Sequence, residues 1–450
     1  MTSVMWFRRD LRLRDNPALR AAAADGDVLG LFVLDPVLWR SAGPARRAWL
    51  AGTLRSLDES MGGRLCLRSG DPATVVPDVV AAVRATTLHV AHDSNPYARS
   101  RDRAVVSALP GSVTGVATGT PYAVPPGSLS NGSGDPYKVF TPFARAWRSH
   151  GWEPPAPAPD GLSWVGHPGD EPARALLDEA AGEGPEGMPR PGEDAALRRF
   201  REFVERDVDD YDDVRDDPGA DRTSRMSPYL KLGVVHPRQL LAELAGRRSP
   251  GAATYEKELA WREFYADVLH HNPDSAWRDL RPVPGLTYDE PEDAVEAWKT
   301  GTTGFPIVDA GMRQLLAEGW MHNRVRMITA SFLTKDLHVW WPLGARHFLD
   351  HLVDGDLASN NHGWQWVAGT GTDAAPYFRV FNPVTQGLKF DGHGDYVRRW
   401  VPEVAHLPGK AAHEPWEHAE GYAHGYPRRI VDHAEERRVT LDRYQRGRQS

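Results

Sequence analysis

The feature that most constrains the fold is a change of hydrophobic pattern along the chain. Up to about residue 125, short apolar segments at 2–8 and 28–34 alternate with helical segments at 17–24 and 45–60. Strands that alternate with helices predict a parallel, Rossmann-like α/β sheet. After about residue 196 the apolar residues recur at helical spacing only, which predicts an all-α domain.

A stretch with linker composition separates the two patterns. Residues 126–195 are rich in proline and glycine, except that the spacing within 137–147 predicts a short helix. A chain of 450 residues is also longer than one ordinary core. We therefore predict an α/β domain at 1–125, a linker at 126–195 and an all-α domain at 196–450. Further strands are predicted at 64–67 and 87–91 and further helices at 75–84, 195–206, 237–245, 255–270, 308–318, 323–337 and 344–352.

Composition excludes several classes of protein. The net charge of −8 argues against a protein that coats nucleic acid, although cationic residues gather at 313–335 and 379–399. The single cysteine, Cys66, excludes a disulfide framework. No metal-ligand motif, membrane-spanning run or export signal is present. We expect a cytoplasmic protein without a metal site.

Two helical segments carry polar groups at one-turn spacing. Glu258, Trp261 and Arg262 share one face of the helix predicted at 255–270. The common interpretation of such a face is a surface ion pair beside a core tryptophan. Asn323 and Met327 share a face in the next segment, where methionine is more often a gap filler.

A third segment places an acid, an amide and an indole on one line. Asp356, Asn360 and Trp364 recur every four residues, with Asp354 just before the helix. Helix capping explains a carboxylate at this position equally well. The full line would suit a planar, redox-active ring that forms hydrogen bonds. Ten of the 16 tryptophans lie beyond residue 250, which fits either a large helical core or such a site.

The segment TSRMS, Thr223–Ser227, places hydroxyls and an arginine before a helical segment. That combination makes a phosphate site plausible, although serine and threonine caps are common. The usual glycine-rich dinucleotide and P-loop motifs are absent.

The order of the motifs resembles one family. WFRRDLRLRDNPAL, YKVFTPF, WREFY, GWMHNRVRMITASFLTKDL and DGDLASNNHGWQWVAGTGTDAAPYFRVFNP are similar to segments of the photolyase/cryptochrome family, from about residue 3 to about 430. WMHNRVRM and NNHGWQW resemble the class I enzymes that repair cyclobutane pyrimidine dimers. The resemblance implies an enzyme that binds FAD and UV-damaged DNA, and we expect a monomer without an obligatory protein partner.

The resemblance also implies roles for individual residues. Residues that would bind FAD are Tyr211, Thr223, Ser224, Arg225, Met226, Ser227, Tyr255, Asn323, Arg326, Asp354, Gly355, Asp356 and Asn360. Residues that would contact the lesion or the DNA are Arg215, Glu258, Trp261, Arg262, Asn323, Arg324, Met327, Trp366 and Gln386. Glu258 would be the catalytic hydrogen-bonding group, and Asn360 would lie beside the flavin N5.

Two further expectations follow from the resemblance. A light-harvesting pigment would lie near Asp35, Arg46, Tyr97 and Arg99. Tyr97 and Ala98 replace the Asn-Glu pair of folate-binding members, so 8-hydroxy-5-deazaflavin is expected, with methenyltetrahydrofolate or no pigment as alternatives.

Flavin photoreduction would use Trp364 and Trp341, with Tyr288 where the family has a third tryptophan; Trp340 or Trp277 are the alternative exits.

Three other functions stay open from the sequence. A (6-4) photolyase would have a histidine-rich pattern where this chain has HNRVRM. A cryptochrome-like light sensor would usually carry a longer tail beyond the flavin domain. A plain electron-transfer flavoprotein would not need Glu258 together with Trp261.

Overall fold

The computed structural model describes residues 1–373 and 379–449. The chain forms two compact units. The first unit contains 1–209, 224–273 and 353–355, and the second contains 210–223, 274–352 and 356–450. The boundaries near 125 and 195 mark changes of sequence pattern, and as domain boundaries they stay predictions. Within the last resemblance motif, residues 374–378 lie outside the described residues.

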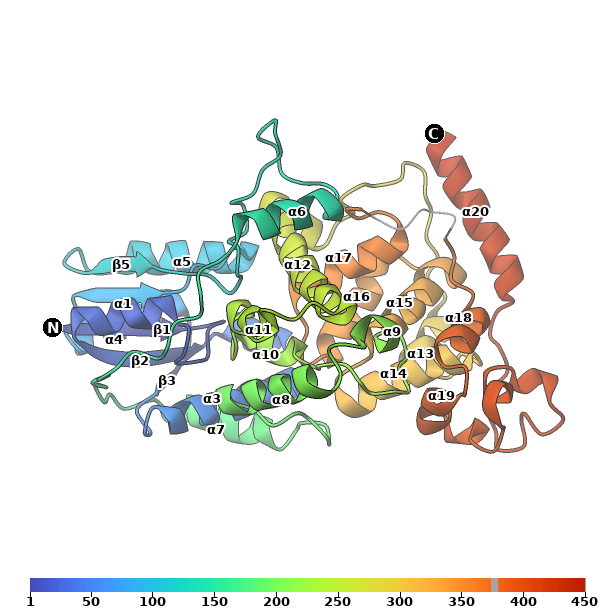
Figure 1. The fold of residues 1–450 in the computed structure, drawn as a ribbon, viewed down its shortest axis with the longest axis horizontal. Coiled ribbons are helices and arrows are strands. Elements are labelled where there is room, and N and C mark those ends of the chain that lie inside the picture. The colour runs from blue at the N-terminus through green and yellow to red at the C-terminus, as the bar shows by residue number, and fades with distance from the viewer. Residues whose placement is uncertain (374–378, 450) are drawn as a thin grey trace. The chain divides into compact units, whose positions relative to one another are not determined.

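The first unit contains the predicted parallel sheet (Figure 1). Its strands are β1 (Thr2–Phe7), β2 (Asp27–Leu34), β3 (Cys66–Ser69), β4 (Thr87–Val90) and β5 (Thr114–Ala117), in the spatial order β3-β2-β1-β4-β5 with all neighbours parallel. Val4, Leu29, Leu31 and Leu88 of these strands are buried in one hydrophobic core cluster. The weak strand β5 was not predicted.

The helices that connect these strands begin in a common way. They are α1 (Pro17–Asp25), α2 (Pro36–Ser41), α3 (Pro44–Ser60), α4 (Pro72–Ala82) and α5 (Pro96–Ala108), each with proline in its first turn. Proline has no N–H to leave unpaired there, and its fixed φ suits a helix start. Side chains of Asn16, Asp35 and Asp71 cap α1, α2 and α4.

The predicted linker is more ordered than its composition suggested. The short helix expected at 137–147 is present as α6 (Phe140–His150). Helix α7 (Glu171–Ala181) was not predicted, and it packs on α3 and β3. Helix α8 (Glu193–Arg206) follows it. The helix at 137–147 was the single helix expected between 126 and 195, and α7 is a second one, in which Ala173, Leu177 and Ala180 bury one face.

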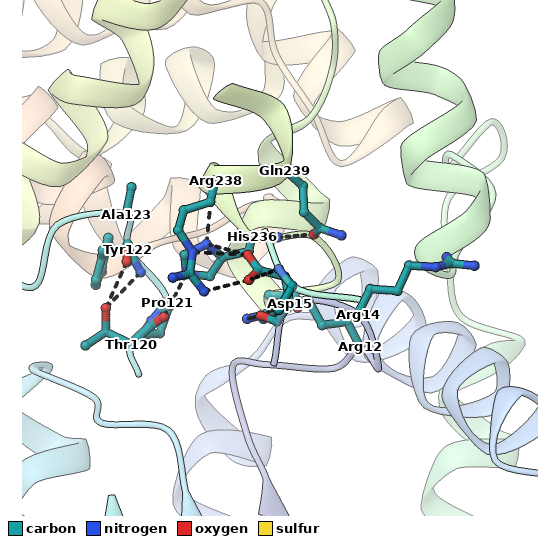
Figure 2. Close-up of polar contacts among 12 residues, drawn as sticks. Arg12, Arg14, Asp15, Thr120, Pro121, Tyr122, Ala123, His236, Arg238 and Gln239 are labelled. Atoms are coloured by element: carbon teal, nitrogen blue, oxygen red, sulfur yellow. Dashed lines mark hydrogen bonds and ion pairs between the residues drawn. The ribbon is translucent and has the colours of Figure 1, made fainter. Parts of the chain in front are cut away.

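A buried polar network holds the loop after β1 against the later helices of the first unit. These helices are α10 (Ser227–Leu232), α11 (Pro237–Leu244) and α12 (Pro250–His271). Figure 2 shows Arg238 of α11 in a two-point ion pair with Asp15 (Nη2–Oδ1 2.6 Å, Nε–Oδ2 3.2 Å). His236 donates from Nε2 to the Thr120 carbonyl at 2.9 Å, and burial, then Arg12, lower its pKa well below the usual value.

The second unit is helical around one large core. Its α-helices are α9 (Tyr211–Val214), α13 (Glu292–Thr300), α14 (Pro306–Glu318), α15 (Asn323–Ser331), α16 (Trp341–His351), α17 (Leu357–Ala368), α18 (Pro383–Phe390), α19 (Asp395–Trp400) and α20 (His433–Gln449). Short 3-10 turns lie at Pro273–Ala276, Pro402–Val404, Gly409–His413 and Pro415–Glu417. Trp298, Trp341 and Trp364 lie within this core, so part of the tryptophan excess is structural.

One predicted helix changes character partway. The segment 323–337 was expected to be one α-helix, but α15 ends at Ser331 and a π-helix follows at Phe332–Asp336. The change places Lys335 and Asp336 in the interior, where α20 supplies polar partners for both. The sequence pattern cannot show this, because the partners lie about 100 residues away.

Among the described residues, no helix has the length and apolar character needed to cross a bilayer. Within the same part of the chain, no group of three His, Cys, Asp or Glu side chains is arranged to hold a metal ion.

Candidate functional site

The segment Thr223–Ser227 forms a sharp turn before α10. Arg225 adopts a left-handed φ of 50°, a conformation that is costly for a residue with a side chain and is found at functional turns. The Ser224 hydroxyl lies 2.9 Å from the Tyr255 hydroxyl and also accepts the Met226 N–H at 3.3 Å. The structure thus brings together Ser224 and Tyr255, two residues predicted to bind the cofactor.

Thr223 has a buried hydroxyl without a hydrogen-bond partner in the described part of the chain. A buried hydroxyl that makes no hydrogen bond costs about 1–3 kcal/mol. Such a group fits a site that offers an O–H to an acceptor such as a phosphate oxygen.

Two further residues predicted at the cofactor, Ser227 and Asp354, contact each other within the first unit. The Ser227 hydroxyl donates to Oδ2 of Asp354 at 2.6 Å, and Asp354 is only 6% exposed. Gly355, beside it, is buried. The carboxylate that the sequence placed just outside α17 therefore fixes the first residue of α10.

Helix α17 carries the predicted line of acid, amide and indole. Asp356 caps the helix by accepting the Ser359 N–H at 3.1 Å, so the capping interpretation is correct. The Asn360 amide nitrogen donates to the Ala345 carbonyl at 3.1 Å and to Asn361 Oδ1 at 2.8 Å. Both of its N–H groups are thereby engaged, and the side chain can offer its carbonyl oxygen to a ligand.

The remaining predicted cofactor residues lie in the second unit. Tyr211 is buried at the start of α9. Asn323 is exposed at the start of α15, whereas Arg326 is half-buried and donates from Nε to the Met321 carbonyl at 2.8 Å. Their roles toward a cofactor stay predictions.

On α12, Trp261 has a fixed ring plane. It stacks on Phe140 of α6 with 3.8 Å between ring centroids and 7° between planes. Trp261 is half-buried, so part of the indole remains accessible. Phe140 was not among the predicted site residues, although it lies in the YKVFTPF motif that carried part of the resemblance.

Glu258 and Arg262 of α12 have different surroundings. Glu258 is half-buried, and its charge contributes, after burial, to the raised pKa of Tyr255. Arg262 donates to the carbonyls of Pro121 (3.2 Å) and Leu230 (3.1 Å) and lies over the Tyr122 ring. These bonds hold Arg262 in the first unit, and its phosphate contact stays a prediction.

The predicted DNA contacts of the second unit include a preformed ion pair. Arg324 binds Asp216 at two points (Nε–Oδ1 3.2 Å, Nη2–Oδ2 2.8 Å), and its guanidinium lies over Phe390. Arg215 lies 3.9 Å from the same carboxylate. Asp216 thus orients both cations but also offsets part of their charge. Met327 and Trp366 are partly buried against the core, and Gln386 is half-buried on α18.

The two tryptophans that were predicted for photoreduction are buried in the second unit. Trp364 is 2% and Trp341 1% exposed. Gly344 of α16 lets the helix approach Trp364, since a Cβ there would lie 2.2 Å from the indole. Trp341 precedes Gly344 by one turn and donates from Nε1 to Asp279 at 2.8 Å. The sequence pattern does not single out Asp279, because its partners are two indoles about 60 residues away.

Trp340 and Tyr288 lie at the surface, next along from Trp364 and Trp341. Trp340 is 40% and Tyr288 38% exposed, with 6.2 Å between their ring centroids. Trp340 lies 6.5 Å from Trp341 by the same measure. Tyr288 and the alternative exit Trp340 are thus neighbours.

The predicted pigment residues are only partly brought together. Tyr97 donates its hydroxyl to Asp35 at 2.6 Å, and burial together with this carboxylate raises the pKa of the phenol. Arg46 instead donates to the Ser41 carbonyl at 2.7 Å. Arg99 is among the neighbouring cations that, after burial, lower the pKa of His270.

The fold and these sites define a class of protein, one with an α/β unit, a helical unit and a candidate dinucleotide site. The hydroxyls of TSRMS suit a dinucleotide phosphate, and the Asn360 carbonyl suits a ring N–H. Two family models match: residues 3–160 match DNA photolyase, and residues 255–446 match the FAD binding domain of DNA photolyase.

Individual relatives agree over nearly the whole chain. A deoxyribodipyrimidine photo-lyase of Streptomyces griseus is 43% identical over 448 residues, 97% of each chain. A class III photolyase structure from Agrobacterium tumefaciens has a TM-score of 0.91 at 36% identity, covering 100% of this chain and 98% of that one. An archaeal photolyase from Sulfolobus tokodaii with two FAD molecules has a TM-score of 0.87 at 29% identity, covering 99% and 100%. The chain belongs to the DNA photolyase family.

Proposed function

We propose that this protein is a deoxyribodipyrimidine photo-lyase, which uses light to split cyclobutane pyrimidine dimers in UV-damaged DNA. The observation that carries the proposal is the full-length relationship to the Streptomyces griseus photo-lyase at 43% identity. The pairing of Glu258 with a stacked Trp261 on α12 supports it, because a plain electron-transfer flavoprotein has no need of a base-binding surface. We expect the protein to act as a monomer in the cytoplasm.

The lesion must leave the base stack before it can be repaired. Flipping costs roughly a few kcal/mol, and less for a damaged site that pairs poorly. Trp261 offers a flat indole held by Phe140, and Trp366 offers a second partly exposed ring. Stacking on an aromatic side chain is worth about 1–3 kcal/mol per base, which is enough to offset the cost of flipping.

Glu258 is the polar group proposed to act on the lesion. Its carboxyl is half-buried on the helix that carries Trp261, and we propose that it hydrogen-bonds a pyrimidine carbonyl. A hydrogen bond aimed at the oxygen where negative charge develops stabilises the transition state more than the ground state. Asn323, Met327 and Arg324 of α15 are proposed to complete the contacts to the lesion.

FAD, when bound in its reduced form, supplies the light-excited electron donor for this chemistry. Thr223 to Ser227, with Tyr211 and Tyr255, are proposed to hold its phosphate and ribose end. The Asn360 carbonyl oxygen is proposed to accept a hydrogen bond at N5, since both amide N–H groups are engaged within the protein. Arg326, Asp354 and Asp356 would lie beside the ring system.

A panel of DNA lesions tests the proposal. The purified protein with chemically reduced FAD is illuminated with blue light on DNA carrying one cyclobutane thymine dimer, one (6-4) product or no lesion. We expect intact thymines from the cyclobutane dimer only, and none in the dark. Repair of the (6-4) product alone would favour the (6-4) enzyme. Absence of repair on all substrates would favour the light sensor.

The pigment of the α/β unit is a separate part of the proposal. We propose 8-hydroxy-5-deazaflavin near the hydrogen-bonded pair Asp35 and Tyr97, with Arg46 and Arg99 nearby. The two FAD molecules of the Sulfolobus tokodaii structure add FAD as a competing pigment. Mass analysis of pigment released from the protein of its native host decides among deazaflavin, folate and a second FAD.

Photoreduction of oxidised FAD is proposed to draw electrons through the series Trp364, Trp341 and Tyr288. The burial of the two indoles and the exposure of Tyr288 support a path from the interior to the surface. A Tyr288→Phe protein should then form no tyrosyl radical and should photoreduce more slowly. Wild-type kinetics in that variant would show that Tyr288 is not on the path.

A further inference from the structure

We propose that Asp279 is the proton acceptor of the photoreduction path and that Trp340 is a relay between Trp341 and Tyr288. The inference rests on the photoreduction part of the proposed function and adds two residues to it.

Asp279 binds both indoles of the Trp340–Trp341 doublet. Its Oδ1 accepts the Trp341 Nε1–H at 2.8 Å, and its Oδ2 accepts the Trp340 Nε1–H at 3.3 Å. One carboxylate therefore holds the two rings in a fixed relation, edge to face, with 70° between their planes. A carboxylate stabilises positive charge on an indole far better than a neutral acceptor does.

Trp340 lies between the buried indole of Trp341 and the exposed phenol of Tyr288. Centroid separations are 6.5 Å from Trp341 to Trp340 and 6.2 Å from Trp340 to Tyr288. Exposure rises from 1% at Trp341 to 40% at Trp340. Positive charge on an exposed ring is stabilised by water, so a hole gains stability when it moves from Trp341 to Trp340.

The charge and proton balance is complete along this series. When light drives one electron from Trp364 toward oxidised FAD, Trp341 replaces the electron that Trp364 lost. Trp340 then replaces the electron that Trp341 lost, so the positive charge moves to Trp340. Oxidised Trp340 is a strong N–H acid and passes its Nε1 proton to Oδ2 of Asp279, leaving a neutral indolyl radical. That radical then takes an electron from Tyr288 and its proton back from Asp279, while the phenol releases its own proton to water.

An external thiol completes the cycle. It gives Tyr288 a hydrogen atom and is left as a thiyl radical, so Asp279 ends as it began. The exposed ring of Tyr288 makes this final transfer accessible from solvent.

The other nearby carboxylate is less suited to this task. The Asp289 carboxylate accepts a hydrogen bond from Arg443 Nη2 at 2.6 Å, and this bond lowers the pKa of Asp289. Burial of part of the ring and the charge of Asp279 raise the pKa of Tyr288, so its proton is released only after oxidation. Asp279, with an oxygen on each indole N–H, is therefore the base that the geometry supplies.

The test follows tryptophan radicals by transient absorption in the protein with oxidised FAD, without DNA. Asp279→Asn keeps an acceptor oxygen and the shape of the side chain but removes the base. We expect loss of the indole proton to slow by about tenfold or more, the size of a weak general-base effect, with a changed solvent deuterium effect. Trp340→Phe should lower the tyrosyl yield several-fold, whereas Trp277→Phe, the matched control, should behave as wild type.

A second readout does not depend on light. In the protein labelled with ¹⁵N-tryptophan, the Nε1–H resonances of Trp340 and Trp341 should both move upfield in Asp279→Asn, because a neutral amide forms a weaker hydrogen bond than a carboxylate. If Asp279→Asn left both the rate of indole proton loss and the two resonances unchanged, the role of Asp279 would be overturned while the photoreduction proposal would stand. Absence of any tryptophan radical in the wild type would overturn the photoreduction proposal as well, and repair of dimers by reduced protein would be judged separately.

Discussion

Glu258 illustrates how one side chain carries the proposed repair chemistry. It lies one turn after Tyr255 on α12, and its charge contributes to the raised pKa of that phenol. We propose that Glu258 acts on the lesion through a hydrogen bond, so its removal should affect the reaction more than the binding of FAD.

We predict that Glu258→Ala, which removes the hydrogen-bonding group, lowers the number of dimers repaired per absorbed photon by about tenfold to a hundredfold, while FAD stays bound. Removing one such stabilising group typically costs about 3–4 kcal/mol in an enzyme with a thermal barrier, and a photochemical reaction feels only part of it. The matched control is Glu256→Ala on the same helix, where Glu256 pairs with Arg148. An undiminished quantum yield in Glu258→Ala would remove the residue from the mechanism.

Some site contacts followed from the sequence and others did not. The residues Ser224, Tyr255, Ser227 and Asp354 were all expected at the cofactor, and the structure joins them in two hydrogen-bonded pairs. Asp279 was not expected, because a lone aspartate in a loop has no signature of its own. Its importance comes from two indole N–H groups that only the folded chain brings to it.

The C-terminal helix α20 is fastened to the π-helix by buried polar groups. Lys335 is 0% exposed and donates to the Ala368 carbonyl at 2.9 Å and to the Tyr444 hydroxyl at 2.7 Å. Asp336 bonds to His433 at 2.5 Å, and burial raises the pKa of this carboxyl to about 6. Burial lowers the pKa of Lys335 to about 7.

These shifts predict how stability depends on pH. The folded protein releases the Lys335 proton near pH 7, whereas the unfolded chain keeps it until about pH 10.4. The contribution of the neutral Lys335 amine to the free energy of unfolding is therefore complete above about pH 10.4 and is lost as the pH falls toward 7. We predict that the free energy of unfolding rises between pH 7 and 9 by up to about 1.4 kcal/mol per unit from this group.

Lys335→Met should flatten this dependence, because the new side chain does not titrate and fills the space of the lysine up to its Cε. Urea unfolding of both proteins at pH 7, 8 and 9 measures the difference. Tyr444 retains its bond to the Ala368 carbonyl in the variant, so α20 remains docked. Parallel pH curves for the two proteins would show that Lys335 is not the titrating group.

At the same scale, the sequence predicted regular elements better than irregular ones. The alternation of strands and helices was sufficient for β1 to β4, because proline and a capping side chain mark the start of several intervening helices. It was insufficient for α7, a short helix inside a proline-rich stretch. It was also insufficient for the π-helix, whose buried polar groups are stabilised by α20, about 100 residues away.

For the whole molecule, the net charge of −8 makes DNA binding a local property. Affinity for damaged DNA should fall linearly as salt rises on logarithmic axes, with a slope set by the few phosphates that are neutralised. Arg324→Gln should reduce that slope by about 0.9, the value for one phosphate contact. Arg55→Gln, which breaks an exposed pair with Asp178, serves as the control and should leave the slope unchanged.

The salt titration also tests Asp216, which holds Arg324 at two points. Asp216→Asn should free charge on Arg324 and strengthen binding to damaged and undamaged DNA alike, because phosphate contacts carry no sequence or lesion information. A salt response as flat as that of an unrelated acidic protein would contradict the assignment of these arginines to DNA.

The central claim is that light drives repair by an electron that returns to its source. The most direct measurement follows one sample of protein with reduced FAD, without oxygen, on DNA with a single thymine dimer under blue light. Restored thymines are counted by chromatography while the flavin spectrum is recorded. We predict many repaired dimers per protein with the flavin still reduced. No restored thymine, or one oxidised flavin for each dimer repaired, would contradict the account.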